Sequence, residues 1–138
     1  MPLLVDTGPL YALADADDAW HGRVREFLEE QEEMLLVPVT VLPEVAYLLA
    51  SRLGAHVERA FIESLVAAEL AVEELRPADV ERSSELLATY PDIGFVDATV
   101  VAMAERLKLA AVVTTDRRHF GPIRPRHRFA FELLPPAA

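Results

Sequence analysis

The sequence has 138 residues, of which 52% are hydrophobic and only 5 are glycine. That length suits one domain and that composition excludes a disordered chain, so we expect residues 1–138 to form a single domain. No apolar run reaches the roughly 18 residues of a membrane span, and no signal peptide is evident, which makes the cytoplasm the expected location. The absence of cysteine excludes disulfides, thiolate zinc sites and cysteine nucleophiles.

The charge is acidic overall and unevenly distributed. A net charge of -10 is unfavourable for binding nucleic acid, because phosphate contacts require Lys or Arg. However, residues 117–138 contain five arginines and one acid, a net +4, whereas residues 1–116 contain eight basic and 22 acidic residues, a net -14. The basic segment either lies in solvent and balances the negative charge of residues 1–116, or binds phosphate. Its position directly after Asp116 favours the second interpretation.

The expected elements alternate between short apolar runs and segments of helical periodicity. In chain order, strands are expected over 3–5, 35–39, 71–75 and 111–114, with a final edge strand over 129–134. Helices are expected from residue 16 or 17 to 31, and over 41–53, 57–70, 78–90 and 96–109. Continuous apolar runs suit strands that are buried on both faces, so the pattern predicts an α/β fold with a central, mainly parallel sheet of four to five strands covered by helices.

Two acids directly follow expected strands. Asp6 ends the run Leu3–Val5, and Asp116 comes shortly after the run 111–114. Ligands of parallel α/β proteins collect at the carboxyl ends of strands, especially where the strand order reverses. Helix capping or a turn is the structural alternative for each acid, because aspartate is favoured in both positions.

Two further acids interrupt apolar helical segments. Glu44 lies among the apolar residues of 41–49, and Asp97 lies between Val96 and Ala98. A carboxylate in such company either reaches solvent or has a partner, because burial of an unpaired charge is unfavourable. The alternatives are a solvent-facing position for Glu44 and a first-turn position favoured by the helix dipole for Asp97.

Four acids that converge from two strand ends and two helices would require a cation to balance their charges. Ligands that are all oxygen atoms favour magnesium or manganese over zinc or copper. The four histidines, at positions 21, 56, 119 and 127, show no metal-ligand spacing. The residues therefore predict a carboxylate site for Mg²⁺ or Mn²⁺.

Four motifs, in this order, resemble those of the PIN-domain ribonucleases. They are VDTGPL at 5–10, VLPEV at 41–45, VDATVVA at 96–102 and VTTDRRHF at 113–120. The resemblance extends from Leu3 to Phe120, nearly the whole chain, and the chain length is similar to that of the VapC toxins of toxin–antitoxin pairs.

The resemblance implies a three-layer α/β/α sandwich whose acids bind one or two Mg²⁺ or Mn²⁺ ions and hydrolyse RNA. It implies metal-ligand roles for Asp6, Asp97 and Asp116, and either a ligand role or orientation of the attacking water for Glu44. For a VapC-like toxin it also implies homodimerisation and a small antitoxin protein that places an arginine among the acids. Apolar helix residues at positions 20, 27 and 61 are candidates for the dimer surface or for the core.

Other residues near these motifs have two interpretations each. Thr7 and Thr115 either add hydroxyl hydrogen bonds to the site or have turn roles, and Arg117 and Arg118 are candidates for holding flanking phosphates. His119 is expected to pack or cap rather than to act in the site. Asp92, five residues before Asp97, is either a turn residue or a substitute metal ligand.

Competing functions remain open at this point. The triplet Asp6-Thr7-Gly8 also occurs in aspartic proteases, although five expected helices disagree with their β-dominated fold. A receiver-like phosphoacceptor needs a lysine after a later strand, and the only lysine, Lys108, lies within an expected helix. A housekeeping PIN-domain nuclease and a catalytically inactive PIN-like binding module are the alternatives within the family.

Overall fold

The centre of the molecule is a five-stranded sheet, seen in a computed structural model that describes residues 1–137. All four strand pairings are parallel, and the strand order is β3-β2-β1-β4-β5. The strands are β1 (Leu3–Val5), β2 (Leu35–Pro38), β3 (Ala71–Glu73), β4 (Ala111–Val113) and β5 (Glu132–Leu134). From β1 the chain builds outward on one side to β3 and then returns to add β4 and β5 on the other, so the order reverses between β1 and β4.

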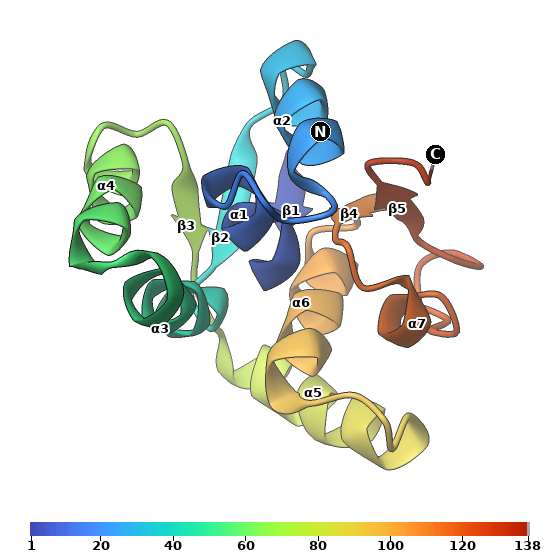
Figure 1. The fold of residues 1–138 in the computed structure, drawn as a ribbon. Helices are drawn as coiled ribbons and strands as arrows, with labels where there is room; N and C mark the ends of the chain where they lie inside the picture. The colour runs from blue at the N-terminus through green and yellow to red at the C-terminus, as the bar shows by residue number, and fades with distance from the viewer. Residues whose placement is uncertain (138) are drawn as a thin grey trace.

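Helices flank this sheet (Figure 1), which confirms the α/β class and the expected α/β/α architecture. They are α1 (Thr7–Ala14), α2 (His21–Glu30), α3 (Val41–Leu53), α4 (Ala55–Val66), α5 (Pro77–Thr89), α6 (Phe95–Arg106) and α7 (Arg117–Phe120). Helix α5 packs on α6, α3 packs on α4, and α1 packs on both α2 and α3. Within residues 1–137, none of these helices has the length and apolar character needed to cross a membrane.

The core lies between the sheet and its helices. Every residue of β1 and β4 is buried, as continuous apolar runs in central parallel strands require. Helix α6 has a continuous buried stretch, since its residues from Ala98 to Ala104 are all buried. This packing fixes the first turn of α6, and with it Asp97, relative to the sheet.

Several boundaries differ from the sequence-based expectations. The helix expected from residue 16 or 17 begins only at His21, because Asp15 and Asp18 accept hydrogen bonds from the N–H groups of Asp17 and Trp20 and thereby form turns. Two later helices end earlier than expected. Ala68 and Lys108 adopt left-handed backbone conformations, with φ of 60° and 55°, which helical residues do not adopt.

Two helices were not expected at all. Helix α1 follows β1 immediately and has five buried residues among eight, so it lacks the polar face that makes a helix visible as a periodic pattern. Helix α7 has only four residues, too few for any periodicity. Both helices directly follow the strand ends at which Asp6 and Asp116 lie.

Candidate active site

Asp6 and Asp116 lie at the point where the strand order reverses. Strands β1 and β4 pair directly, with Val5 opposite Val113, and the N–H of Asp6 donates to the Val113 carbonyl at 2.9 Å. Asp6 and Thr114 therefore leave the same edge of the sheet side by side, and Asp116 follows two residues later. This is the position at which open parallel sheets bind ligands.

A buried threonine joins the two strand ends. The hydroxyl of Thr114 donates to Asp6 Oδ2 at 3.0 Å, and the same hydroxyl accepts from the N–H of Asp116 at 3.0 Å. Thr114 is completely buried and Asp6 is only 5% exposed. One hydroxyl thus orients the Asp6 carboxylate and fixes the backbone from which the Asp116 side chain projects.

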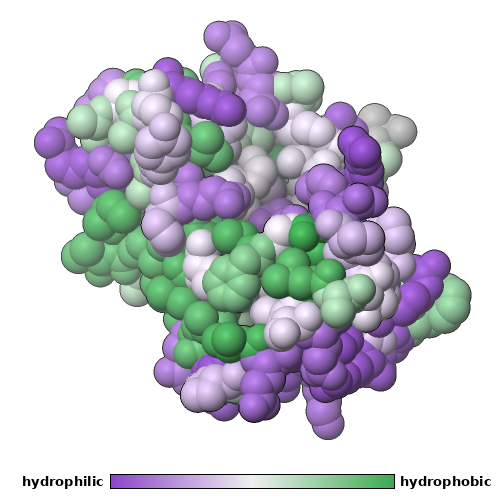
Figure 2. Space-filling model, turned by 90° about the horizontal axis from the view of Figure 1, so that it is seen from below, coloured by the Kyte–Doolittle hydropathy of each residue, from purple (hydrophilic) through white to green (hydrophobic). Residues whose placement is uncertain are grey.

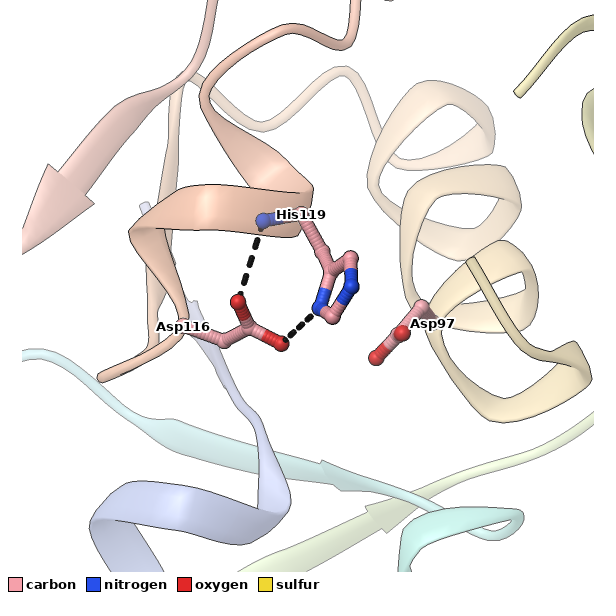
Figure 3. Close-up of side chains that lie close together, drawn as sticks. All are labelled: Asp97, Asp116 and His119. Carbon is pink, nitrogen blue, oxygen red and sulfur yellow. Dashed lines mark hydrogen bonds and ion pairs between the residues drawn. The ribbon is translucent and has the colours of Figure 1, made fainter. Parts of the chain in front are cut away.

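A second group brings together Asp97, Asp116 and His119. Figure 3 shows the His119 imidazole between the carboxylates of Asp97, from α6, and Asp116, which precedes α7. One potential ligand atom from each residue lies within 4.8 Å of the other two. Asp116 caps α7, since its Oδ1 accepts from the His119 N–H at 3.0 Å, while its Oδ2 lies 2.7 Å from His119 Nδ1.

The electrostatics of the acids show that they are crowded. Burial, together with the nearby charges of Asp97 and Glu44, raises the pKa of Asp6 from 3.8 to about 7, although hydrogen bonds from Thr7 and Thr114 oppose the shift. The pKa of Asp97 is also raised, first by burial and then by the charges of Asp116 and Glu44. The hydrogen bond to Asp116 raises the pKa of His119. Such a set of crowded oxygen donors fits a divalent cation, which would offset both the burial and the repulsion.

The other predicted acids lie differently. Glu44 is exposed in the first turn of α3, near enough to Asp6 and Asp97 to raise both pKa values, but it is outside the group of mutual near neighbours. Asp92 is exposed in a turn before α6 and is outside that group as well. The structure therefore brings Asp97 and Asp116 together, places Asp6 and Glu44 beside them, and favours the turn interpretation for Asp92.

The arginine after Asp116 contacts the end of β5 and Trp20. Arg117 donates to the backbone carbonyls of Leu133 and Pro135, and its guanidinium lies 5.5 Å from the centre of the Trp20 ring. The Nη2 group of Arg117 is thus engaged at the end of β5, whereas its buried Nε has no hydrogen-bond partner among residues 1–137, so the expected phosphate contact stays a prediction. Arg118 is exposed.

The two threonines that the sequence singled out do not bind the acids through their side chains. The Thr7 hydroxyl is buried and has no hydrogen-bond partner among residues 1–137, while its N–H bonds to Asp6. Thr115 packs against α1 instead, because a Cβ added to Gly8 would lie 2.2 Å from Thr115 Oγ1. A side chain at position 8 would therefore force Thr115 to shift where the loop after β4 approaches α1.

Sequence reasoning missed Thr114 and His119. The apolar run predicts Thr114 only as the last residue of a strand, although a polar residue that ends a buried apolar run at the ligand-binding edge is itself a signal. His119 was expected to pack or cap, yet it contacts Asp116 and lies beside Asp97. Its spacing of three residues from Asp116 would have indicated the contact once a helical turn after Asp116 was assumed.

Comparisons with known proteins agree with this architecture. The sequence model of the PIN domain matches residues 3–121. The chain is 31% identical to ribonuclease VapC26 of Mycobacterium tuberculosis over 135 residues, which cover 96% of this chain and 100% of that protein. It is also similar to the crystal structure of VapC20 from Mycobacterium tuberculosis, described as a sarcin–ricin loop cleaving toxin, with a TM-score of 0.78 and 25% identity over 83% of this chain and 90% of the other.

A more distant likeness extends over the whole chain. VapBC2 from Rickettsia felis, solved bound to a DNA fragment from its promoter, matches with a TM-score of 0.72 and 15% identity, covering 98% of this chain and 100% of the other. At that identity the likeness concerns the fold. It includes the end of the chain that follows residue 121, where β5 completes the sheet.

Proposed function

Because this chain belongs to the PIN-domain family and is a homologue of a VapC ribonuclease, we propose that it is a metal-dependent endoribonuclease that hydrolyses RNA phosphodiester bonds. The observation that carries the proposal is the gathering of Asp97 and Asp116 beside the buried Asp6 at the strand-order reversal. Within the described part of the chain, these side chains come from three separate elements, and their mutual repulsion is relieved most directly by a bound cation.

The proposed ligands are Asp6, Asp97 and Asp116, and Glu44 is proposed as a further ligand or as the residue that orients the attacking water. A bound Mg²⁺ or Mn²⁺ supplies a water of lowered pKa and neutralises charge on the phosphate. The protein contributes orientation, since Thr114 holds the carboxylate of Asp6 and the backbone of Asp116. The exposed position of Glu44 suits contact with a water or with the phosphate.

RNA contacts are proposed for the exposed Arg118, next to the acids, rather than for the whole basic segment. Of the five arginines after Asp116, four make contacts within the protein. Besides Arg117, Arg124 donates to the Gly121 and Ile123 carbonyls, Arg126 pairs with Glu85, and Arg128 donates to the Ala130 carbonyl. Of these contacts only the Arg126–Glu85 pair neutralises an acidic side chain, and the others hold the segment against backbone carbonyls.

We further propose that the chain is the toxin of a VapBC-type pair, acting in the cytoplasm, and that residues 1–138 form one PIN-like domain. The solved relatives include a toxin–antitoxin complex from Klebsiella pneumoniae, with 21% identity and a TM-score of 0.71 over 88% of this chain and 92% of the other. An apolar cavity of about 460 Å³, lined from α1, α2, α3, α4 and β2, suits an apolar antitoxin segment. The pairing of β5 with β4 supports one domain, because it joins residues beyond 121 to the central sheet.

A homodimer is proposed as well. Large exposed apolar side chains occur at Tyr47 of α3, Val80 and Leu87 of α5, and Phe95 of α6. Figure 2, which views the molecule from below, shows apolar residues gathered in one area of that face. Exposed apolar areas of this kind mark interaction surfaces. The residues expected as dimer candidates, Trp20, Phe27 and Phe61, are all partly buried, and the latter two pack against the core.

The test of catalysis is cleavage of a panel of structured RNAs by the purified protein, with Mn²⁺ or with a chelator. Asp97→Asn should reduce the rate by at least about 100-fold, because it removes a charged ligand. Asp92→Asn is the matched control, since it makes the same change at an exposed acid five residues away, and it should cleave like the wild type. Cleavage that survives the chelator, or an Asp97→Asn variant as active as the control, would remove the basis of the proposal.

Expression in bacteria tests the toxin role separately. The wild-type chain should arrest growth and Asp97→Asn should not, although both should accumulate to the same level. Normal growth with the wild type, at a level where its RNA cleavage is measurable in the lysate, would favour a housekeeping nuclease.

A further inference from the structure

We propose that His119 supplies a nitrogen ligand to the divalent ion, so that the site is a mixed nitrogen and oxygen site with Asp97 and Asp116 rather than a site of carboxylates alone. The inference rests on the proposed metal-dependent function. It adds a residue to which neither the four-acid pattern nor the spacing of the histidines assigns a role.

The distances fit ligands that share one ion. Two ligand atoms about 2.1 Å from an ion, at right angles to each other, lie about 3 Å apart. The contact between His119 Nδ1 and Asp116 Oδ2 is 2.7 Å, and the three potential ligand atoms lie within 4.8 Å of one another. Opposite ligands of one ion are about 4.2 Å apart, so the three side chains would need to close by less than about 1 Å to share a single ion.

The position of the imidazole is built by the local chain. Asp116 accepts a hydrogen bond from the His119 N–H at 3.0 Å and so caps the single turn of α7. This turn places the His119 imidazole next to the same Asp116 carboxylate. Phe120, only 1% exposed, anchors that turn in the core. The His119 side chain itself is 31% exposed, so it is held in place while remaining accessible to an ion and to substrate.

A nitrogen ligand has a consequence for metal preference. Magnesium binds through oxygen almost exclusively, whereas manganese and the later divalent ions accept imidazole, with affinity that increases from manganese to copper. Loss of His119 should therefore weaken Mn²⁺ binding much more than Mg²⁺ binding. A purely structural role, in which the imidazole only packs on Asp116, would affect the two ions alike.

The direct test is pulsed electron paramagnetic resonance of the Mn²⁺-loaded protein, which detects a ¹⁴N nucleus bonded to manganese. The wild type should show this coupling and His119→Ala should lose it. The matched control is His56→Ala, because His56 is exposed on α4, and it should retain the coupling. Far-UV circular dichroism of each variant establishes that the fold is intact.

Calorimetric titration with each ion completes the test. His119→Ala should lower the Mn²⁺ affinity by about tenfold or more, within the range found when the surroundings of a metal site are altered, and should change the Mg²⁺ affinity by less than about threefold. If the wild type binds Mn²⁺ without ¹⁴N coupling, or if the coupling persists in His119→Ala, the role of His119 is refuted while the nuclease proposal stands. If the wild type binds neither ion, both proposals fall.

Discussion

Replacement of Asp6 by asparagine should make the metal-free protein more stable at neutral pH, although it removes a proposed ligand. The two side chains have nearly the same shape, and an asparagine oxygen still accepts the hydrogen bond of Thr114. What changes is the charge. In the absence of a cation the ionised carboxylate is buried, 5% exposed, and close to other acids, so the wild type is destabilised by a charge that the variant lacks.

The magnitude follows from the pKa of Asp6, which is raised from 3.8 to about 7 in the folded chain. The folded state holds this proton more tightly than the unfolded state. The corresponding stability is therefore complete below pH 3.8, decreases as the pH rises, and is lost above pH 7. Each unit of pKa shift corresponds to about 1.4 kcal/mol, so the loss approaches about 4 kcal/mol in all and about 3 kcal/mol between pH 5 and pH 8.

Urea unfolding in the presence of a chelator, followed by far-UV circular dichroism at several values between pH 5 and pH 8, measures this difference. The free energy of unfolding of Asp6→Asn minus that of the wild type should increase with pH by about 3 kcal/mol across the range. Added Mn²⁺ should reverse the order at pH 8, because only the wild type retains the full ligand set. A difference that stays constant with pH would refute the assignment of a buried, crowded carboxyl group to Asp6.

Three further variants test the packing of the fold. Gly8→Ala should cost about 1–3 kcal/mol in unfolding free energy, because the new Cβ would lie 2.2 Å from Thr115 Oγ1. Gly22→Ala in α2 meets nothing within 4 Å and should be neutral or stabilising by up to about 1 kcal/mol. Arg106→Ala should cost about 3–5 kcal/mol in thermal or urea unfolding, because it leaves Asp79, 2% exposed, without its charged partner at 3.0 Å. Equal stability of the two glycine variants, or an unchanged midpoint for Arg106→Ala, would contradict these contacts.

The sheet could be predicted from the sequence because its strands are buried on both faces. The run Leu3–Val5 was expected with the bounds of β1, and the other strands lie within their expected ranges. Helix α3 also has its expected bounds, Val41–Leu53, since Gly54 has a φ of 112° and ends it. These elements have long or uniform apolar patterns, and tertiary contacts reinforce what the local pattern already favours.

The convergence of Asp6 and Asp116 was also predictable, because parallel strands place their carboxyl ends at one edge. What the sequence did not reveal is the direction of individual side chains beyond that edge. The role of Thr114 depends on the register of β1 and β4, which places its hydroxyl against Asp6, and a one-residue slip would direct it to the opposite face. The direction of the Arg117 side chain depends on β5, which is formed by residues later in the sequence and supplies the Leu133 carbonyl that Arg117 contacts.

His119 shows why a residue of this kind escapes pattern analysis. Its contact with Asp116 requires a helix of four residues, and isolated helices of that length are unstable without tertiary support. Here the support comes from the buried Phe120 and from the Asp116 cap. One oxygen of the Asp116 carboxylate thus caps the turn, and the other contacts the His119 imidazole that the turn positions. The position of His119 therefore depends on a turn that Asp116 caps and Phe120 anchors, and that dependence becomes visible only in three dimensions.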